Sequence, residues 1–368
     1  SAARDGKFSS MYKPISQPSK SEAYAWVKPD DKLQMSDHFS SLLFGGSISN
    51  TILELVTLIA PLVAMFFFGD ALNVKISMPF SELALYFIVC SVVRRVYNAY
   101  LEAVYFSFPS KRTQPPKEHL LKQEKDLCGR DIAQLKLLHF HDKLTILSQF
   151  ALNFALYFYL PGYYPADEEQ PLSFQERFGK LVLNHYVMSF GMYWAHRSLH
   201  DIQFLWKHIH SIHHYAKHPL SRNTYEDHWF DNFLNAFVGH VFAQILVPLD
   251  RPTFWFSRIF RILESLEKHS GVSCGFNLAH SAQQWLPFAQ MPHHHDWHHE
   301  GFKGSNYTFT SIGGIWDCIF GTRKSGRHTA NKCAAATRHD MDEVLKGRAN
   351  PSPFNPMLPL VGLLALVV

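Results

Sequence analysis

The sequence predicts an all-α integral membrane protein, in which about four transmembrane helices carry a cytosolic cap of histidine-rich helices. Three observations support this fold class: apolar stretches rich in phenylalanine, loops of contrasting charge between them, and two dense groups of histidines at helical spacing. Of the 368 residues, 31 are Phe and 23 are His, whereas only 18% carry a charge. A composition with few charges and long apolar runs is typical of a chain that is partly embedded in lipid.

The first two transmembrane helices are predicted at residues 51–68 and 83–93. Glu54 is the only charged residue among the 18 residues of the first stretch. A helix of that length crosses most of a hydrocarbon core of about 30 Å. The second stretch is followed by Arg94 and Arg95 and then by several aromatic residues, as is typical of the membrane–water interface.

The third and fourth transmembrane helices are predicted at residues 144–160 and 178–195. The loop at 161–176 carries acidic residues and no Lys or Arg, whereas residues 1–49 and 94–143 are rich in both. Because positively charged loops stay on the cytosolic side of a membrane, the basic segments and the region after the fourth helix are placed there. Four crossings are consistent with this arrangement.

Composition and charge divide the chain into four parts. They are a polar leader at 1–49, a first transmembrane hairpin with its cytosolic connection at 50–143, a histidine-bearing domain at 144–323 and a C-terminal tail at 324–368. A net charge of +4 is too small to indicate a nucleic-acid partner. The five cysteines form no CxxC pair, which argues against a disulfide framework and against a thiolate zinc site.

Two histidine clusters predict a pair of metal ions in the cytosolic cap. The first cluster, HRSLHDIQFLWKHIHSIHH, begins at residue 196, and the second, HHHDWHH, begins at residue 293. Eight of their histidines are three or four residues apart: His196, His200, His210, His213, His214, His295, His298 and His299. Side chains at these spacings share one face of an α-helix. Imidazole is a common metal ligand, and eight ligands exceed the need of one ion, so we expect a dimetal site.

Carboxylates near the clusters are candidates to orient the ligands. An acid that accepts a hydrogen bond from the second ring nitrogen of a histidine selects the tautomer that binds metal. The candidates are Asp201, Glu226, Asp227, Asp231, Asp296 and Asp317. Each of them is equally well explained as an ordinary solvated acid.

Six segments together resemble the fatty acid hydroxylase and sterol desaturase superfamily. Three of them are the histidine motifs HRSLH, HSIHH and HDWHH. His228, 14 residues beyond the second motif, matches a lone histidine of the family, and the ESLEKHSG segment with His269 is similar to sterol C-4 methyl oxidases. The closing WDCIFGT at 316–322 is similar to the end of the family's domain. The resemblance covers residues 140–323 approximately, which identifies 144–323 as a fatty acid hydroxylase/sterol desaturase domain.

The resemblance implies a membrane-bound di-iron oxygenase that attacks an unactivated C–H bond of a lipid with O2. The implied catalytic metal ligands are His196, His200, His210, His213, His214, His228, His269, His295, His298 and His299. Zinc is a substitute for the two iron ions, because nitrogen sites bind it more tightly than Fe²⁺. The resemblance further implies cytochrome b5 with its reductase as electron donor. The implied location is the endoplasmic reticulum membrane, with several crossings and a cytosolic histidine region.

The sequence departs from the methyl oxidases at three places. Residues 272–276 read VSCGF where those enzymes have a proline-containing stretch, and Trp229 stands where the family has proline. The segment between His269 and His295 is also longer and contains His280, which is an alternative ligand to His269. The substrate therefore stays open within the family.

Three functions are compatible with these motifs. The EKHSG segment favours a sterol as substrate, in a C-4 methyl oxidation or a related reaction. Fatty acyl or sphingoid-base hydroxylation is the second reading, because KHIHSIHH is similar to sphingoid-base C-4 hydroxylases. The third is a non-enzymatic membrane protein that binds or transports metal. A transporter needs ionisable residues near the middle of its spans, whereas the histidines here follow the end of a predicted span.

Overall fold

The fold is known from a computed structural model, which describes residues 78–108, 111–114, 128, 130–160, 162–165, 172–283, 289–299 and 306–323. All regular secondary structure in these ranges is helical, and the single β-bridge joins Arg112 to Val272. The all-α class that the sequence predicts is confirmed for this part of the chain.

Three helices of 28 residues each form the frame of the molecule: α3 (Phe80–Ser107), α5 (Ile132–Tyr159) and α6 (Phe174–Asp201). Two of them begin at a capping box. Asp131 and Ser173 accept from the backbone N–H three residues further on, and the Gln134 and Glu176 side chains accept from the backbone N–H of the capping residue. These reciprocal bonds satisfy N–H groups that a helix start leaves free.

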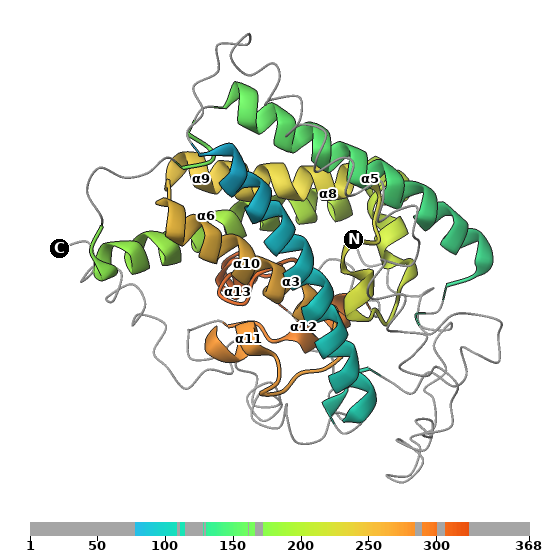
Figure 1. Cartoon of the computed structure of the whole chain (residues 1–368). Coiled ribbons are helices and arrows are strands. Elements are labelled where there is room, and N and C mark those ends of the chain that lie inside the picture. Colours follow the sequence, from blue (N-terminus) through green and yellow to red (C-terminus); the bar gives the residue numbers. More distant parts are fainter. Residues whose placement is uncertain are drawn as a thin grey trace.

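A second layer of helices lies against this frame. It contains α8 (Trp229–Asn235), the π-helical turn η6 (Ala236–Val241), α9 (Phe242–Leu246) and the longer α10 (Arg251–Lys268). Helix α3 packs along α10, α5 lies on α8, and α6 contacts η6 and α9 (Figure 1). Between them, buried side chains such as Leu83, Leu152, Leu156, Val241 and Phe254 form an apolar core.

Short helices complete the described chain and carry most of the histidines. They are α7 (Gln203–His208), the 3-10 helices η4 (His210–Tyr215) and η5 (Ser221–Tyr225), α11 (Leu278–Gln283), α12 (Pro292–His299) and α13 (Gly314–Ile319). Every residue of α12 is buried, so this histidine-rich segment lies inside the protein rather than on a surface.

The predicted transmembrane helices are not confirmed. The stretches 83–93, 144–160 and 178–195 do lie in α3, α5 and α6, but none of the helices described is both long and apolar enough to cross a bilayer. Helix α3 continues through Arg94 and Arg95, where the sequence predicted its end. The stretch 51–68 lies outside the described residues.

Polar side chains inside the long helices are the reason for this difference. In α5, Gln149 donates a hydrogen bond to the Asn232 side chain of α8 at 2.6 Å. Four residues further on, the Asn153 side chain accepts from the Tyr164 hydroxyl at 2.8 Å. These amides lower the mean hydropathy of the stretch, and they bond to neighbouring segments of the same chain.

Two glycines let α6 approach the π-helical turn closely. A Cβ atom at Gly191 would lie 2.5 Å from the carbonyl oxygen of Val238, and one at Gly239 would lie 2.5 Å from Cγ of Met192. Because the first neighbour is backbone, the two helices would have to move apart to accept a side chain at Gly191. This contact sets the distance between α6 and η6.

We therefore predict that Gly191→Ala lowers the free energy of unfolding by about 1–3 kcal/mol, as overpacking of a core does. Chemical denaturation followed by circular dichroism measures the change. Gly275→Ala is the matched control, because a Cβ atom there has no neighbour within 4 Å. Equal stability of both variants would contradict the close α6–η6 contact.

Candidate metal centre

The three histidine motifs lie on three separate helices that meet in the interior. HRSLH forms the C-terminal turns of α6, HSIHH forms η4, and HDWHH forms the end of α12. The second motif is on a 3-10 helix and not on the α-helix that its spacing predicted. Within η4, the Nε2 atoms of His210 and His214 lie 3.2 Å apart, whereas His213 is directed to a different set of histidines.

The described histidines form two groups, each of which could hold a metal ion. The five-histidine group consists of His196, His200, His210, His214 and His298. The four-histidine group consists of His213, His269, His295 and His299. Within each group one nitrogen per ring lies within 4.8 Å of all the others. The structure therefore brings together nine of the ten histidines singled out in the sequence, in the two-site arrangement that their number predicted.

The spacing of the Nε2 atoms fits metal coordination. In the five-histidine group, Nε2 of His196 is 2.9 Å from that of His210 and 3.2 Å from that of His200. In the four-histidine group, Nε2 of His269 is 3.2 Å from that of His213 and 3.0 Å from that of His295. Two nitrogens bound to one ion at 2.0–2.1 Å are about 2.9–3.4 Å apart for bond angles between 90° and 110°. The protein thus presents its ligands at coordination distance.

The opposite ring nitrogens are held by acceptors, which selects the tautomer that metal binding requires. Nδ1 of His196 donates to the Tyr307 carbonyl at 2.7 Å, and Nδ1 of His299 donates to the Ala216 carbonyl at 2.9 Å. Nδ1 of His269 donates to the Ser265 carbonyl at 3.2 Å. A carbonyl only accepts, so the proton is on Nδ1 and the lone pair of Nε2 is directed into the group.

Burial keeps these rings neutral. It holds the pKa values of His196, His214 and His295 well below the usual range, and the neighbouring imidazoles lower them further. The pKa of His213 falls to about 4 for the same two reasons, with burial as the larger cause. A cation that binds between the rings therefore does not have to displace protons at neutral pH.

Of the six candidate carboxylates, Asp231 contacts a ligand directly. Its Oδ2 accepts from Nδ1 of His210 at 2.5 Å, and both side chains are almost fully buried. Asp317 supports the ligand His196 indirectly, through Tyr307. It accepts from the backbone N–H of Tyr307 at 2.9 Å and so positions the carbonyl to which His196 donates.

The other four candidate carboxylates contact groups other than the clustered histidines. Asp296 accepts from Thr113 and Gln114, and Glu226 forms an ion pair with Arg130. Asp201 pairs with Arg197 on the surface of α6. Asp227 is buried close to Asp231, and burial with that neighbouring charge raises its pKa well above the usual range.

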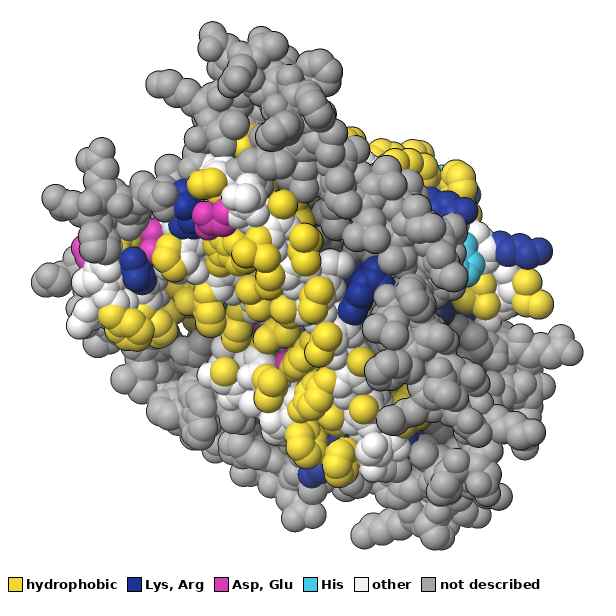
Figure 2. Space-filling view, viewed as in Figure 1, with side chains coloured by type: hydrophobic (Ala, Val, Ile, Leu, Met, Phe, Trp, Pro, Cys, Tyr) yellow, Lys and Arg dark blue, Asp and Glu magenta, His cyan; other side chains and the backbone are white. Residues whose placement is uncertain are grey.

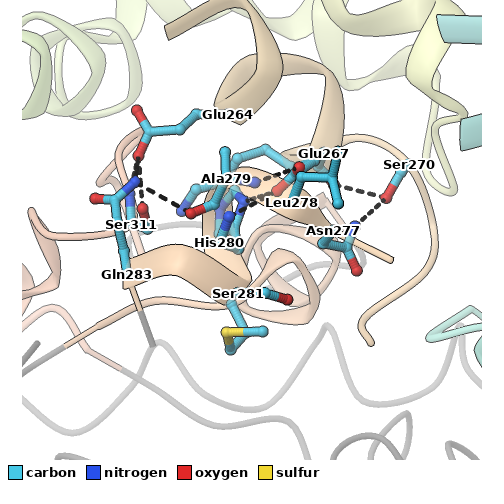
Figure 3. Close-up of polar contacts among 12 residues, drawn as sticks. Glu264, Glu267, Ser270, Asn277, Leu278, Ala279, His280, Ser281, Gln283 and Ser311 are labelled. Carbon is cyan, nitrogen blue, oxygen red and sulfur yellow. Dashed lines mark hydrogen bonds and ion pairs between the residues drawn. The ribbon is translucent and has the colours of Figure 1, made fainter. Parts of the chain in front are cut away.

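A buried carboxylate fixes the segment that follows His269. Glu267 accepts from the backbone N–H groups of Ala279 and His280, both at 2.8 Å, and from Nδ1 of His280 at 2.6 Å (Figure 3). It also accepts from the Tyr97 hydroxyl of α3. His280, the alternative ligand, is thereby directed to Glu267 and lies in neither histidine group, whereas His269 lies in the four-histidine group.

His228 is the predicted ligand that the structure does not bring to either group. Its Nδ1 accepts from the Phe230 N–H at the start of α8, and its ring lies 4.2 Å from that of His141 between ring centres. A role for His228 as a ligand stays a prediction from the family resemblance.

Sequence reasoning missed the groups that surround the ligands. The Phe309 ring stacks on His196 with 4.2 Å between ring centres, and the Trp206 ring lies 4.8 Å from that of His200. Backbone carbonyls that accept from histidines carry no mark in a sequence. The Asn306-Tyr307 turn has one feature that points to it, because Asn tolerates the positive φ of 53° that Asn306 adopts.

A cavity of about 320 Å³ adjoins the two groups. His210, His213 and His269 form part of its wall, together with Phe309. The remaining wall comes from α3, α5, α6, η5, α8, η6 and α10, and it mixes aromatic and aliphatic side chains with polar and charged ones, among them Asp227, Asn235 and Lys268. Its volume is at the lower end of the range for small-molecule sites. A molecule in this cavity would lie against the histidine ligands.

Comparison with known proteins agrees with this geometry. Residues 181–322 match the family model for fatty acid hydroxylase. The chain is 32% identical over 161 residues to a methylsterol monooxygenase of Arabidopsis thaliana, which covers 42% of this chain and 56% of the relative. It is 30% identical over 156 residues to a very-long-chain aldehyde decarbonylase of Oryza sativa subsp. japonica, covering 42% and 50%.

A third relative is a putative methylsterol monooxygenase of Dictyostelium discoideum, 36% identical over 138 residues that cover 37% of this chain and 47% of the relative. The chain thus spans about half the length of the relatives it matches. No solved structure matches it.

Removing one histidine should lower the metal content of the protein. His213→Ala removes a ligand of the four-histidine group alone, so purified protein should lose one of two bound ions while the other remains. Inductively coupled plasma mass spectrometry measures the ratio of metal to protein. His208→Ala is the control, because His208 is exposed on α7 and belongs to neither group. Unchanged metal content in His213→Ala would refute the assignment.

The orientation of the His210 ring should depend on the charge of Asp231. Asp231→Asn keeps the shape of the side chain and removes its charge, so the hydrogen bond to His210 weakens. We expect the affinity of the five-histidine group for metal to fall about 10- to 100-fold. Asp201→Asn should leave it unchanged, because Asp201 is partnered by Arg197 and lies outside both groups. Competition with a chelator of known affinity distinguishes the two variants.

Proposed function

We propose that this chain, whose residues 181–322 form a fatty acid hydroxylase domain, uses two metal ions to oxidise a C–H bond of a lipid with O2. The observation that carries the proposal is the convergence of nine buried or partly buried imidazoles, from four segments of the chain, beside a cavity lined in part by aromatic and aliphatic side chains. A metal-storage role does not account for that cavity, whereas an enzyme requires a substrate site against its metal ligands.

Iron is the metal we propose for both groups. Imidazole nitrogen suits iron, zinc, copper and nickel, and no cysteine sulfur is part of either group. When bound, an iron pair supplies the activation of O2 for attack on an unreactive C–H bond. The nine ligands are neutral, so the positive charge of the ions is not cancelled by the protein. Zinc is a plausible substitute in purified protein because nitrogen ligands bind it tightly.

The protein's own contribution is to orient the ligands and to exclude water. The Nδ1 acceptors of His196, His210, His269 and His299 keep these four rings in place before metal binds, which lowers the free-energy cost of assembling the site. Phe309 covers His196, and α12, every residue of which is buried, keeps its histidines away from solvent. A dry cavity prevents side reactions of activated oxygen with water.

A sterol that carries a methyl group is the substrate we favour. Two of the relatives named above are called methylsterol monooxygenases, and the EKHSG segment of α10 is similar to sterol C-4 methyl oxidases. The relative called an aldehyde decarbonylase supports a second candidate, a very-long-chain aldehyde. Fatty acyl and sphingoid-base hydroxylation is the remaining alternative.

We further propose that the protein works at the endoplasmic reticulum membrane with cytochrome b5 and its reductase as electron donor. Leu85, Ile88, Val92 and Val96 form a stripe along α3, and each is more than half exposed. Figure 2 shows hydrophobic side chains gathered on the face over which α3 runs. An exposed apolar face of this kind is suited to contact with lipid.

Turnover of defined lipids tests the proposed function. Iron-loaded protein, cytochrome b5, its reductase and NADH are incubated with isotopically labelled O2 and either a 4-methylsterol, a long-chain aldehyde or a long-chain fatty acid. We expect a labelled hydroxyl group on the sterol and no product from His213→Ala. Consumption of the aldehyde alone would favour the second candidate. No oxidation of any lipid by fully loaded protein would refute the proposal.

A further inference from the structure

The cavity follows one face of α10. The residues of this helix region that line it are Arg258, Arg261, Ile262, Ser265, Lys268 and His269, and most of them are three or four residues from another member of the set. At a rise of 1.5 Å per residue, Arg258 is about 16 Å along the helix from His269. A bound lipid therefore extends from the histidine groups toward a part of the cavity where two arginines lie.

Arg258 is a buried cation that has no counter-charge among the described residues. It is 7% exposed and makes no ion pair in this part of the chain. Its guanidinium contacts the ring and the carbonyl oxygen of His240 on η6, and it lies over the Phe254 ring at 4.8 Å. Its Nε atom has no hydrogen-bond partner within the described ranges. Neither a histidine nor a phenylalanine ring neutralises a guanidinium.

Arg261, one turn further along α10, is only partly compensated. It is 4% exposed, and its Nη1 is 3.5 Å from Glu264, which is an ion pair without hydrogen-bond geometry. Glu264 also accepts from Gln283 and Ser311 (Figure 3). Its carboxylate lies 2.9 Å from the His185 ring. The Nε and Nη1 atoms of Arg261 have no hydrogen-bond partner among the described residues.

A buried charge is costly unless an opposite charge and hydrogen bonds accompany it. A ligand that carries an anionic group would supply both to these guanidiniums. The planar guanidinium matches carboxylate and sulfate oxygens in pairs, and such charge-assisted bonds are about twice as strong as neutral ones. The lining around the arginines includes the apolar Leu152, Leu156 and Val241, which suits the hydrocarbon part of the same molecule.

We infer that the cavity binds a lipid with an anionic group, such as a carboxylate or a sulfate, held by Arg258 and Arg261 with its hydrocarbon part toward the histidine groups. This inference rests on the proposed function and adds a binding preference to it: among sterols and acyl lipids, those that carry an acidic group bind more tightly. An uncharged methylsterol would leave both arginines without an added counter-charge, so we expect it to bind more weakly than a sterol that carries an acidic group.

Binding without turnover tests the inference separately from the oxidation. The metal-loaded full chain is titrated, in the absence of O2 and electron donor, with stearate, octadecanol, cholesterol sulfate and cholesterol. Each acid is compared with the uncharged lipid of the same hydrocarbon skeleton, by displacement of a fluorescent lipid. We expect at least one acid to bind about tenfold or more tightly than its uncharged partner. The pair that shows the preference identifies a straight chain or a fused-ring skeleton.

Arg258→Gln should abolish that preference and leave the affinity for the uncharged lipid unchanged, while Arg258→Lys should restore part of it. Arg177→Gln is the matched control, because Arg177 pairs with Asp250 and does not line the cavity. Metal content shows whether each variant is folded. Equal affinity of acid and uncharged lipid in the unmodified protein would overturn the inference, even if Arg258→Gln fails to fold. If the unmodified, metal-loaded protein prefers the acid but oxidises no lipid in the turnover experiment, the proposed function is overturned and the inference about binding stands.

Discussion

The structure depends on the crowding of nine imidazole rings in the protein interior. Where the proton of each ring is held on Nδ1, as in His196 and His210, Nε2 atoms 2.9 Å apart are favourable only if both lone pairs point at a common cation. Asp231 and three backbone carbonyls fix the Nδ1 proton of His210, His196, His269 and His299. The helices α6, α10 and α12 can therefore be understood as supports that hold ligands in place before metal binds.

The two HxxHH motifs share their ligands between both metal groups. In η4, His210 and His214 belong to the five-histidine group and His213 belongs to the other. In α12 the division is reversed, because His298 joins the five-histidine group and its two neighbours in the motif join the four-histidine group. Two ions bound by these groups would be held by common helices, and a shift of either helix would disturb both. This sharing explains why the motifs need three histidines each.

Helix α10 joins the metal groups to the cavity. His269 caps its C-terminal end as a ligand, and Arg258 lies on the same cavity-lining face three turns earlier. Glu267 fixes that end to α11 and to Tyr97 of α3. A rigid α10 would set the distance between the reacting part of a lipid and its polar group, because His269 and Arg258, which would contact these two parts, lie on the same helix. Such a division suits an enzyme that selects one carbon of a long molecule.

The sequence by itself determined the all-α class, the three histidine motifs and the expectation of two ions, because helical periodicity and ligand spacing are local properties of the chain. It did not predict the 3-10 form of η4 or the position of His228 outside both groups. It also predicted transmembrane helices at apolar stretches that do not qualify as such among the described helices. Only the tertiary structure decided between His269 and His280, since Glu267 binds the second from 13 residues away. It alone paired Asp231 with His210, placed backbone carbonyls against ring nitrogens and buried Arg258 in the cavity. Those contacts join residues that are distant along the chain, and no local pattern records which of them will meet.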